Sequence, residues 1–453
     1  MSDAPLMLGV SGARGIVGKT MTPDVARRFA ACWGAHLVHM ADTQPSVCLG
    51  RDSRPSGTEL SAAAAQGLSA AGCRVIDLGL VATPTVGVMI GALSAAGGVV
   101  ITASHNPTPW NGLKLLDHNG TAPQPELSAD IIDAFKRGDV PTSESPGEIV
   151  QEVRGTDTHV AKVLGQVDPM PLAQRQFAVV LDSVNGAGCQ GGRRVLDAID
   201  CDVTHLGADP TGHFWHEPEP TKANLVGLCE AVVEAGADIG CAQDPDADRL
   251  AIVDEQGRYI GEEYTLVLAV WRMLIDRPDI SLAANLSTSR MIDALAARFD
   301  ARVYRSAVGE ANVAAVMRQH DAPIGGEGNG GVMVPAVTWI RDSLTAMLLI
   351  LDLMRIEDKP LSALVDALPA YEIVKDKLPL AHRADLEPAL ERLRTGFPDG
   401  RIDDSDGIRI DLPEGWAHVR PSNTEPIARI IVEAQTQDAA KALIERVRAV
   451  AGL

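Results

Sequence analysis

The sequence lacks long apolar runs and lacks any arrangement of cysteines that would hold a fold together. No stretch reaches the roughly 18 apolar residues that a membrane span requires. The opening MSDAPLMLGVSGARG reaches glycine and arginine before any apolar segment long enough for a secretion signal. The 7 cysteines are odd in number, scattered and never spaced as CxxC, which argues against a disulfide framework and a zinc cluster. We therefore expect a cytoplasmic protein with reduced, mostly buried thiols.

Positive charge is also in short supply. The chain has 40 Lys and Arg residues against 60 Asp and Glu, which gives a formal net charge of -20. A field of this sign repels nucleic acid and anionic membranes at long range, so we expect neither as a partner. An anionic small molecule would be repelled as well, and a site that binds one must gather its cations locally.

The length indicates several domains. At roughly 100–200 residues per domain, a chain of 453 residues has three or four. Its 46% hydrophobic and 22% charged residues are typical of a globular protein. The polar, proline-bearing stretch 138–149 is predicted to be the first linker. We predict domains over residues 1–145, 150–255, 256–370 and 371–453.

Alternating strand and helix patterns predict parallel sheets in most of the chain. Apolar strands at 46–50, 74–79 and 98–104 are separated by an alanine-rich helix at 60–72 and a helix that begins at Thr83. This βαβαβ order implies a largely parallel sheet. Comparable units of about 100 residues follow, so the sequence predicts a repeated α/β architecture.

The last 80 or so residues follow a different order. A strand at 371–378 and a helix at 386–394 precede two short strands near Gly407 and Trp416, a further strand at 428–434 and a C-terminal helix. This order predicts a smaller α+β domain. The expected fold class is therefore α/β, with three similar domains of mixed, largely parallel sheets and one small α+β domain.

One polar loop follows the buried strand that ends near residue 101. In TASHNP, Pro107 biases Asn106 away from helical conformation, so Ser104 is held exposed at the carboxyl end of a strand. A serine in this position can carry a phosphoryl group. A loop serine taken alone is more often structural or a helix cap.

A second loop, DPDADR, carries carboxylates at alternate positions after a strand. Asp244, Asp246 and Asp248 can direct oxygen ligands at one hard divalent cation, and Mg²⁺ is the natural candidate. An EF-hand calcium loop is an alternative, because Glu255 would stand at its twelfth position. Arg249 occupies the sixth position, where that loop needs glycine, and the flanks have the pattern of strands.

Two further loops offer groups suited to sugar and phosphate. The glycine-rich GGEGNGG supplies Glu327 and Asn329, which can hydrogen-bond adjacent sugar hydroxyls. The segment RPSNTEP combines a guanidinium with hydroxyl, amide and backbone donors, as a phosphate dianion requires. Its candidate residues are Arg420, Ser422, Asn423 and Thr424.

A different class of enzyme is suggested by the glycines after the strand at 177–182. Residues 186–191, GAGCQG, match the GxGxxG pattern of dinucleotide-binding folds, which would make the chain an NAD-dependent oxidoreductase. Three extra residues separate strand and glycines, and the expected acidic residue has no clear candidate. The pattern therefore gives that alternative little support.

TASHNP, DPDADR, GEGNGG and RPSNTEP, in this order and at these separations, resemble the four signature loops of the α-D-phosphohexomutase family. The resemblance covers essentially the whole chain. It implies four domains around a central cleft, each contributing one loop. It also implies a mutase that moves a phosphoryl group between the 1- and 6-positions of a hexose through a 1,6-bisphosphate, which also serves as activator.

The resemblance further implies a role for each loop. Ser104 would be the phosphoserine, and its phosphate would hold Mg²⁺ together with Asp244, Asp246 and Asp248. The family's cations beside the phosphoserine correspond to Arg14 and Lys114, which also have a plain reading as surface charges. Either Lys114 or His105 could accept the proton of the attacking hydroxyl. The remaining substrate contacts would come from Arg249, Glu327, Asn329, Arg420, Ser422, Asn423 and Thr424.

The sugar is predicted from departures within these loops. Members that act on glucose and mannose phosphates usually carry serine and histidine where this chain has Asn329 and Gly331, whereas residues 308–310 and SGARGIVG resemble phosphoglucosamine mutases. We expect glucosamine phosphate, with Glu310 favouring its ammonium group. Glucose or mannose phosphate, or a sugar-phosphate-binding protein without turnover, are the alternatives. The protein would be a monomer or a homodimer.

Overall fold

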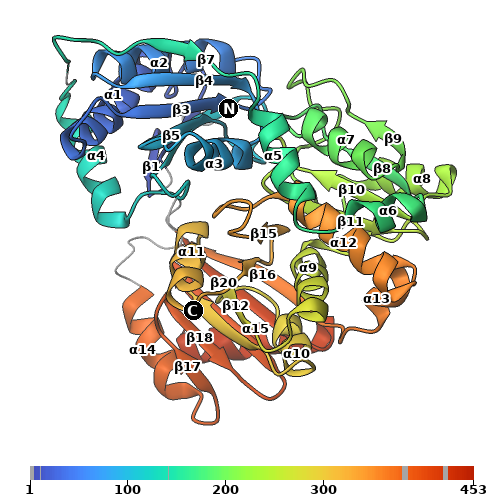
Figure 1. Cartoon of the computed structure of the whole chain (residues 1–453). Coiled ribbons are helices and arrows are strands. Elements are labelled where there is room, and N and C mark those ends of the chain that lie inside the picture. Colours follow the sequence, from blue (N-terminus) through green and yellow to red (C-terminus); the bar gives the residue numbers. More distant parts are fainter. Residues whose placement is uncertain (1–4, 11, 141, 380–385, 422–426, 453) are drawn as a thin grey trace.

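A computed structural model describes residues 5–10, 12–140, 142–379, 386–421 and 427–452. Four sheets, each with its own helices, follow one another along the chain, and colours run from blue to red through them (Figure 1). The expected fold class is confirmed, with three α/β domains and a smaller C-terminal α+β domain.

The central four strands of the first sheet set a pattern that recurs. Two parallel strands, β3 (Ser46–Arg51) and β4 (Arg74–Leu80), lie side by side, and β5 (Gly97–Ile101) pairs with the free edge of β3. The fourth strand, β6 (Trp110–Leu116), then runs antiparallel to β5. Side chains alternate along β3, so that Val47 and Leu49 face one helical layer and Cys48 faces the other.

The second and third sheets repeat this order. In each sheet the first strand lies between the second and the third, and the fourth pairs antiparallel with the third. The second sheet consists of β8 (Ala178–Asp182), β9 (Asp202–Leu206), β10 (Ile239–Gln243) and β11 (Leu250–Asp254). The third consists of β12 (Ser281–Asn285), β13 (Arg302–Ser306), β14 (Ile324–Glu327) and β15 (Gly331–Met333).

This repetition makes three of the four loops with candidate functional residues structurally equivalent. Each joins the third strand of its sheet to the fourth: β5 to β6 carries Ser104, β10 to β11 carries the aspartates, and β14 to β15 follows Glu327. All three loops therefore start at the carboxyl end of a parallel strand, where α/β sheets present their ligand sites.

The first sheet is widened by three further strands. β1 (Met7–Gly9) and β2 (Gly12–Ile16) extend it beyond β6, and β7 (Ile149–Gln151) pairs with β4 at the other edge. The predicted linker at 138–149 thus leads into an edge strand of the first sheet. The four domain boundaries stay predictions.

Helices cover both faces of these sheets. Helices α1, α2 and α4 lie over one face of the first sheet, and α3 lies over the other (Figure 1). The helices of the first two domains are α1 (Pro23–Met40), α2 (Gly57–Ala70), α3 (Thr83–Ala92), α4 (Pro125–Arg137), α5 (Gly155–Leu164), α6 (Pro169–Arg175), α7 (Cys189–Ala198) and α8 (Val226–Ala235). Those of the third are α9 (Glu262–Asp276), α10 (Met291–Ala297), α11 (Glu310–Gln319), α12 (Ser343–Glu357) and α13 (Leu361–Asp366).

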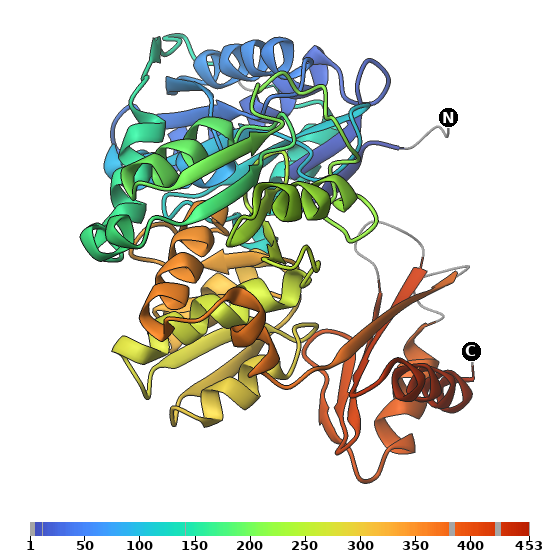
Figure 2. The same ribbon diagram turned by 90° about the vertical axis from the view of Figure 1, so that its right-hand side faces the viewer.

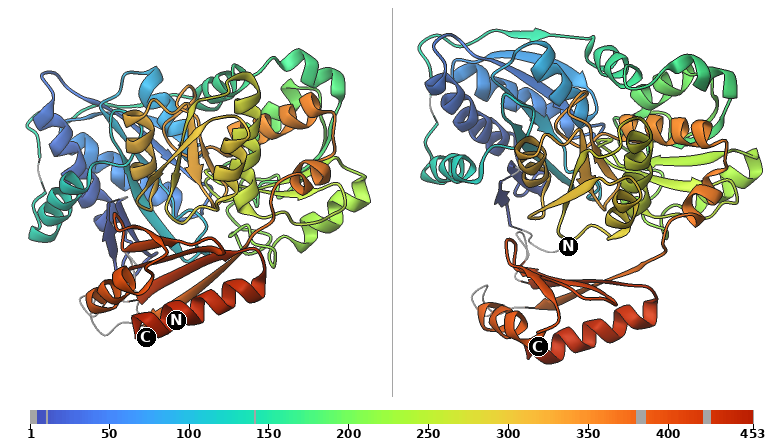
Figure 3. Two further views of the ribbon diagram at one scale, coloured as in Figure 1. Left: turned by 90° about the horizontal axis from the view of Figure 1, so that it is seen from below. Right: turned by 60° about the horizontal axis from the view of Figure 1, so that its bottom comes forward.

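The fourth domain is an antiparallel sheet with helices on one face. It lies beside the third domain in Figure 2, and its helices are on the face turned away from the other domains in Figure 3. The strand order is β16-β20-β19-β18-β17. Its elements are β16 (Glu372–Pro379), α14 (Glu387–Gly396), β17 (Arg401–Asp403), β18 (Ile408–Asp411), β19 (Gly415–Pro421), β20 (Ile427–Ala434) and α15 (Gln437–Ala451).

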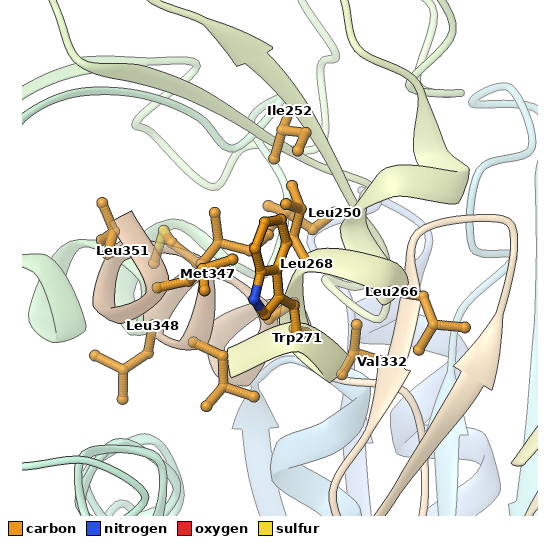
Figure 4. Close-up of a cluster of buried hydrophobic side chains, with 14 of the residues drawn as sticks. Leu250, Ile252, Leu266, Leu268, Trp271, Val332, Met347, Leu348 and Leu351 are labelled. Atoms are coloured by element: carbon orange, nitrogen blue, oxygen red, sulfur yellow. The ribbon is translucent and has the colours of Figure 1, made fainter. Parts of the chain in front are cut away.

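The second and third domains share one hydrophobic core. Side chains of α9, α12, β11 and β15 gather around the Trp271 ring (Figure 4). Met347 and Leu348 of α12 are fully buried in this cluster, as is Leu250 of β11. Burial of each such side chain contributes about 1.5–3 kcal/mol. The shared core joins the aspartate loop of the second domain, residues 244–249, rigidly to the third domain.

A buried polar chain joins the first three domains. Thr85 Oγ1 lies 2.9 Å from His159 Nδ1, and His159 Nε2 lies 3.0 Å from Asp342 Oδ2. Asp342 also caps α12 by accepting from the backbone N–H groups of Leu344 and Thr345. Burial would raise the pKa of Asp342, but His159, Thr345 and the Leu344 N–H together outweigh that effect and hold the pKa below its ordinary value.

All seven cysteines are free, and five of them are buried, as the sequence predicted. In the part of the chain that the structure describes, no helix is both long and apolar enough to cross a membrane.

We expect His159→Leu to destabilise the protein by roughly 2–4 kcal/mol, because it leaves the Asp342 carboxylate buried without its partner. His39→Leu, at an exposed position of α1, is the matched control. Differential scanning calorimetry measures both. Equal transition temperatures for the two variants would contradict a stabilising role for the chain of contacts.

Candidate active site

The serine loop and the aspartate loop meet at one hydrogen bond. Ser104 Oγ donates to Asp244 Oδ2 at 2.9 Å, although 140 positions separate the residues. Ser104 has a φ of 48°, in the left-handed region that a residue with a side chain rarely adopts. The strand-to-strand turn thus holds the serine hydroxyl against the aspartates. The expectation of an exposed serine was wrong, because the aspartate loop covers it and Ser104 is buried.

The aspartate loop is buried and tightly held. One carboxylate oxygen from each of Asp244, Asp246 and Asp248 lies within 4.8 Å of the others, and all three residues are inaccessible to solvent. Ala247 takes a left-handed φ of 57° between them. The first domain fixes this turn, because Thr83 donates its Oγ1–H to Asp246 Oδ2 at 2.7 Å and its N–H to the Asp246 carbonyl.

The unpaired oxygens of this cluster fit a divalent cation. Asp246 Oδ1 and Asp248 Oδ1 are buried and have no hydrogen-bond partner among the described residues. Burial and the two neighbouring carboxylates raise the pKa of Asp244 well above its ordinary value. Buried oxygens without donors and a surplus of negative charge suit a hard cation with oxygen ligands, such as Mg²⁺.

Two cations compensate the outer side of the cluster. Arg341 Nη2 donates to Asp248 Oδ2 at 2.6 Å, and Lys114 Nζ lies 3.3 Å from the same oxygen. Burial alone would lower the pKa of Lys114, but Glu310 and Asp248 outweigh it and raise that pKa. The lysine is therefore a charged, partly buried group rather than a surface cation.

The imidazole of His105 has the opposite character. Its Nδ1 lies 3.3 Å from Ser104 Oγ. Burial, together with Arg249 and Arg14, lowers the pKa of His105 to about 3, so the ring is neutral at pH 7. A neutral imidazole next to the serine can accept a proton.

Arg14 and Arg249 border the same space. Arg14 Nη1 donates to Asn106 Oδ1 at 2.5 Å, within the serine loop. Arg249 Nε lies 3.8 Å from Asp248 Oδ1, and this buried nitrogen has no hydrogen-bond partner among the described residues. Locally gathered cations are what the acidic chain needs at a site for an anion.

Glu327 is held by the third domain and connected to the aspartates. Its carboxylate accepts from Asn285 Nδ2 at 2.9 Å and from Arg341 Nη1 at 2.7 Å. Burial would raise the pKa of Glu327, but Arg341 and Asn285 hold that pKa below its ordinary value. Asn329 donates to Glu327 at 3.4 Å, and its buried Oδ1 has no partner among the residues described.

Glu310 lies in the same charged cluster. Its carboxylate accepts from the backbone N–H and the Nε–H of Arg341, both at 3.1 Å, and lies 3.5 Å from Lys114 Nζ. It shares these two cations with Asp248 and Glu327. The expected role of Glu310 in selecting an ammonium group stays a prediction.

Arg420 belongs to a contact between the third and fourth domains. Its Nε donates to Asp406 Oδ2 at 2.8 Å, and the same oxygen accepts from the Val308 backbone N–H at 3.0 Å. His418 Nδ1 lies 2.8 Å from Ser287 Oγ across this junction. Ser422, Asn423 and Thr424 lie outside the described residues.

The two alternative interpretations, an EF-hand calcium loop and a dinucleotide-binding fold, do not agree with the structure around these segments. DPDADR joins two antiparallel strands rather than helices, and Glu255 accepts from Ser362 instead of turning toward the aspartates. In the GxGxxG segment, a Cβ added to Gly188 would lie 2.3 Å from the Gln243 side chain. These glycines allow close packing in the second domain.

Arg341 is the main residue that sequence reasoning missed. It contacts Asp248, Glu310 and Glu327, and these three carboxylates outweigh burial and raise its pKa well above the ordinary value. In the sequence it stands alone before an apolar helix. The adjacent Asp342 has a recognisable helix-cap pattern, but nothing local indicates that Arg341 joins two loops.

The fold and this cluster define a class of protein. It is a four-domain α/β enzyme with a serine beside a buried group of carboxylates that could hold a metal ion. Four domain families match the chain in order. They are phosphoglucomutase/phosphomannomutase alpha/beta/alpha domain I over residues 5–141, domain II over 157–257, domain III over 261–371, and the C-terminal domain over 373–450. The chain belongs to this phosphohexomutase family and is a mutase, an isomerase that transfers a phosphoryl group within its substrate.

Individual relatives agree along their full length. A probable phosphoglucosamine mutase of Methanopyrus kandleri is 36% identical, over 96% of this chain and 95% of that protein. A phosphoglucomutase/phosphomannomutase of Thermococcus kodakarensis is 35% identical, over 97% of each. The crystal structure of a phosphoglucomutase/phosphomannomutase family protein from Burkholderia thailandensis superposes with a TM-score of 0.87 at 27% identity, over 98% of this chain and 97% of that one.

A partly buried carboxyl beside the loop that follows β14 predicts a pH-dependent stability. Glu263 accepts from the Ser289 N–H and lies against Gly328, and burial raises its pKa to about 8. In the unfolded chain the pKa of this carboxyl is about 4.5. Between these two pKa values the folded protein keeps the proton and the unfolded chain loses it, so the free energy of unfolding falls as pH rises. Glu263→Gln stays neutral and should gain stability over wild type by several kcal/mol at about pH 9.5, but little at about pH 5.

Calorimetric transition temperatures of both proteins at the two pH values measure this difference. Effects of other titrating groups cancel in the comparison. A difference that is the same at both pH values would contradict the raised pKa of Glu263.

Proposed function

We propose that the chain interconverts hexose 6-phosphate and hexose 1-phosphate through a phosphoryl group carried on Ser104, with glucosamine phosphate as the preferred substrate. The observation that carries the proposal is the 2.9 Å hydrogen bond from Ser104 Oγ to Asp244, within a buried aspartate cluster that has unpaired oxygens. A phosphoryl carrier and a cation site meet at this point.

The chemistry consists of two transfers that are the reverse of one another. The substrate hydroxyl attacks the phosphoserine phosphorus, its O–H proton leaves to a base, and the P–O bond to Ser104 breaks to give a hexose 1,6-bisphosphate. After this intermediate turns over, Ser104 Oγ takes the other phosphoryl group, and the freed sugar oxygen is protonated. Mg²⁺ held by Asp244, Asp246 and Asp248 would neutralise charge on the transferring group.

We assign the proton transfer to His105 rather than Lys114, because the negative charge of a phosphoryl group on Ser104 would raise the pKa of the imidazole from its low value in the free protein. The His105 ring is neutral and its Nδ1 lies 3.3 Å from Ser104 Oγ. Lys114 is charged by its contacts with Asp248 and Glu310, which suits it to stabilise the phosphoryl oxygens. Arg14 and Arg249 add charge at the same place.

Residues of the third and fourth domains would hold the sugar and its second phosphate. Glu327 and Asn329 would accept and donate hydrogen bonds at adjacent sugar hydroxyls, and Arg341 keeps Glu327 oriented. Arg420, with Ser422, Asn423 and Thr424, would bind the phosphate that does not react. The bond from Arg420 to Asp406 gives this arginine a carboxylate partner that a phosphate would replace.

The choice of glucosamine phosphate has two supports. Residues 308–310 resemble the corresponding segment of phosphoglucosamine mutases, and a relative with that name is 36% identical. A relative at 35% identity is named for glucose and mannose phosphates, so these sugars are the alternative. Glu310 stays the candidate for recognising the 2-amino group, because it shares Arg341 and Lys114 with two further carboxylates, so that negative charge exceeds positive charge here.

We expect a coupled assay with Mg²⁺ and a hexose 1,6-bisphosphate to show isomerisation that is fastest with glucosamine phosphate. Ser104→Ala should lower kcat at least about 1000-fold, because it removes the atom that carries the phosphoryl group. Ser53→Ala is the matched control, because this buried hydroxyl has no hydrogen-bond partner in the described structure. Equal rates with glucose or mannose phosphate would overturn the sugar, and full activity of Ser104→Ala would overturn the mechanism.

The metal site predicts ligand-dependent stability. Mg²⁺ at about 100 times its Kd should stabilise the wild-type protein by about 2.7 kcal/mol. In Asp246→Asn the loss of one charged ligand should reduce this gain strongly, whereas Asp254→Asn, in the strand beyond the loop, should leave it unchanged. Thermal denaturation with and without Mg²⁺ measures the gain, and an equal gain in Asp246→Asn would place the cation elsewhere.

A further inference from the structure

One buried arginine outside the four signature loops uses every N–H of its guanidinium. Arg54, in the loop after β3, is fully buried. Its Nη2 donates to the carbonyl oxygens of Ser104 and Asn106, both at 2.6 Å, and its Nη1 donates to those of Pro107 at 3.0 Å and Trp110 at 3.1 Å. The fifth donor, Nε, pairs with Asp52 at 3.1 Å. Four carbonyls of the serine loop are thus held by one planar group.

Asp52 holds the other side of the same loop. Its Oδ2 accepts from Thr102 Oγ1 at 2.8 Å, and Thr102 Oγ1 in turn accepts from the Ser104 N–H at 2.9 Å. Arg54 meanwhile binds the Ser104 carbonyl. Both backbone polar groups of Ser104 are therefore tied, directly or through one hydroxyl, to the Asp52–Arg54 ion pair.

The second domain covers this pair. The Arg54 guanidinium lies over the Phe214 ring, 5.0 Å from its centroid. Gly212 approaches so closely that an added Cβ would lie 2.2 Å from the Ser53 carbonyl oxygen, and its φ of 70° also favours glycine. The hydrogen bonds from Arg54 to Asp52 and to the Ser104 carbonyl are buried, which strengthens them.

These contacts account for the left-handed φ of Ser104. A non-glycine residue in that region costs of order 1–3 kcal/mol and persists only where surrounding contacts determine it. Five hydrogen bonds from Arg54 and two through Thr102 supply such contacts. They turn the Ser104 hydroxyl toward Asp244.

We propose that Asp52 and Arg54 are positioning residues that hold Ser104 in the strained conformation required for phosphoryl transfer, with Thr102 as the link between them and the Ser104 N–H. This inference rests on the proposed function for its catalytic consequence, but not for its structural one. Lysine cannot replace Arg54, because an ammonium has three donors and no planar fork.

The test compares Arg54→Lys with Arg272→Lys in the full-length protein. Arg272 is a buried arginine paired with Asp276 and Asp352 between α9 and α12, away from the serine loop. In Arg54→Lys we expect faster amide hydrogen exchange over residues 103–110, unchanged Mg²⁺ affinity, and a roughly 100-fold slower transfer from a hexose 1,6-bisphosphate to Ser104. Arg272→Lys should change none of these.

Thr102→Val, which keeps the shape and removes the hydroxyl, serves if Arg54→Lys does not fold. It should speed exchange at the Ser104 amide and slow the transfer about tenfold. Unchanged exchange in the loop would overturn the positioning, and faster exchange with an unchanged transfer rate would overturn its part in catalysis. If wild type takes up no phosphoryl group while exchange in Arg54→Lys is faster, the proposed function fails and the positioning stands.

Discussion

The structure depends on negative charge buried where three loops meet. Asp244, Asp246 and Asp248 are inaccessible to solvent, and each is held from another part of the chain: Ser104 and Thr83 from the first domain, and Arg341 from the third. Such a cluster persists only when donors and cations compensate it, so the domains cannot separate without exposing unpaired charge. The two oxygens left without donors are the ones a divalent cation would bind.

Repetition of one sheet pattern explains how these groups come together. In each of the first three domains the loop between the third and fourth strands starts at the same edge. The chain places its serine and its aspartates in two of these equivalent loops and Glu327 directly before the third. The shared core around Trp271 fixes the second domain to the third, and the contact through His159 fixes both to the first. The fourth domain is joined mainly by polar groups, such as Asp406 with Val308 and Ser287 with His418.

The sequence predicted the elements and loops well because periodicity and turn residues are local signals. Strands β3, β4, β5 and β8 and the loops with Ser104 and Asp244 follow directly from them. Interactions between distant residues left no such signal. Arg341 and Arg54 each stand alone in the sequence, and their partners lie up to 93 positions away. For the same reason the sequence did not indicate the two cationic partners of Glu310, which come from other elements.

The central claim is that Ser104 carries the phosphoryl group, and mass spectrometry tests it most directly. The protein would be incubated with Mg²⁺ and glucose 1,6-bisphosphate, and then weighed intact and as peptides. Our account predicts one added phosphoryl group per chain, on the peptide that contains Ser104. A phosphoryl group on another residue, or isomerisation without any phosphorylated protein, would contradict it.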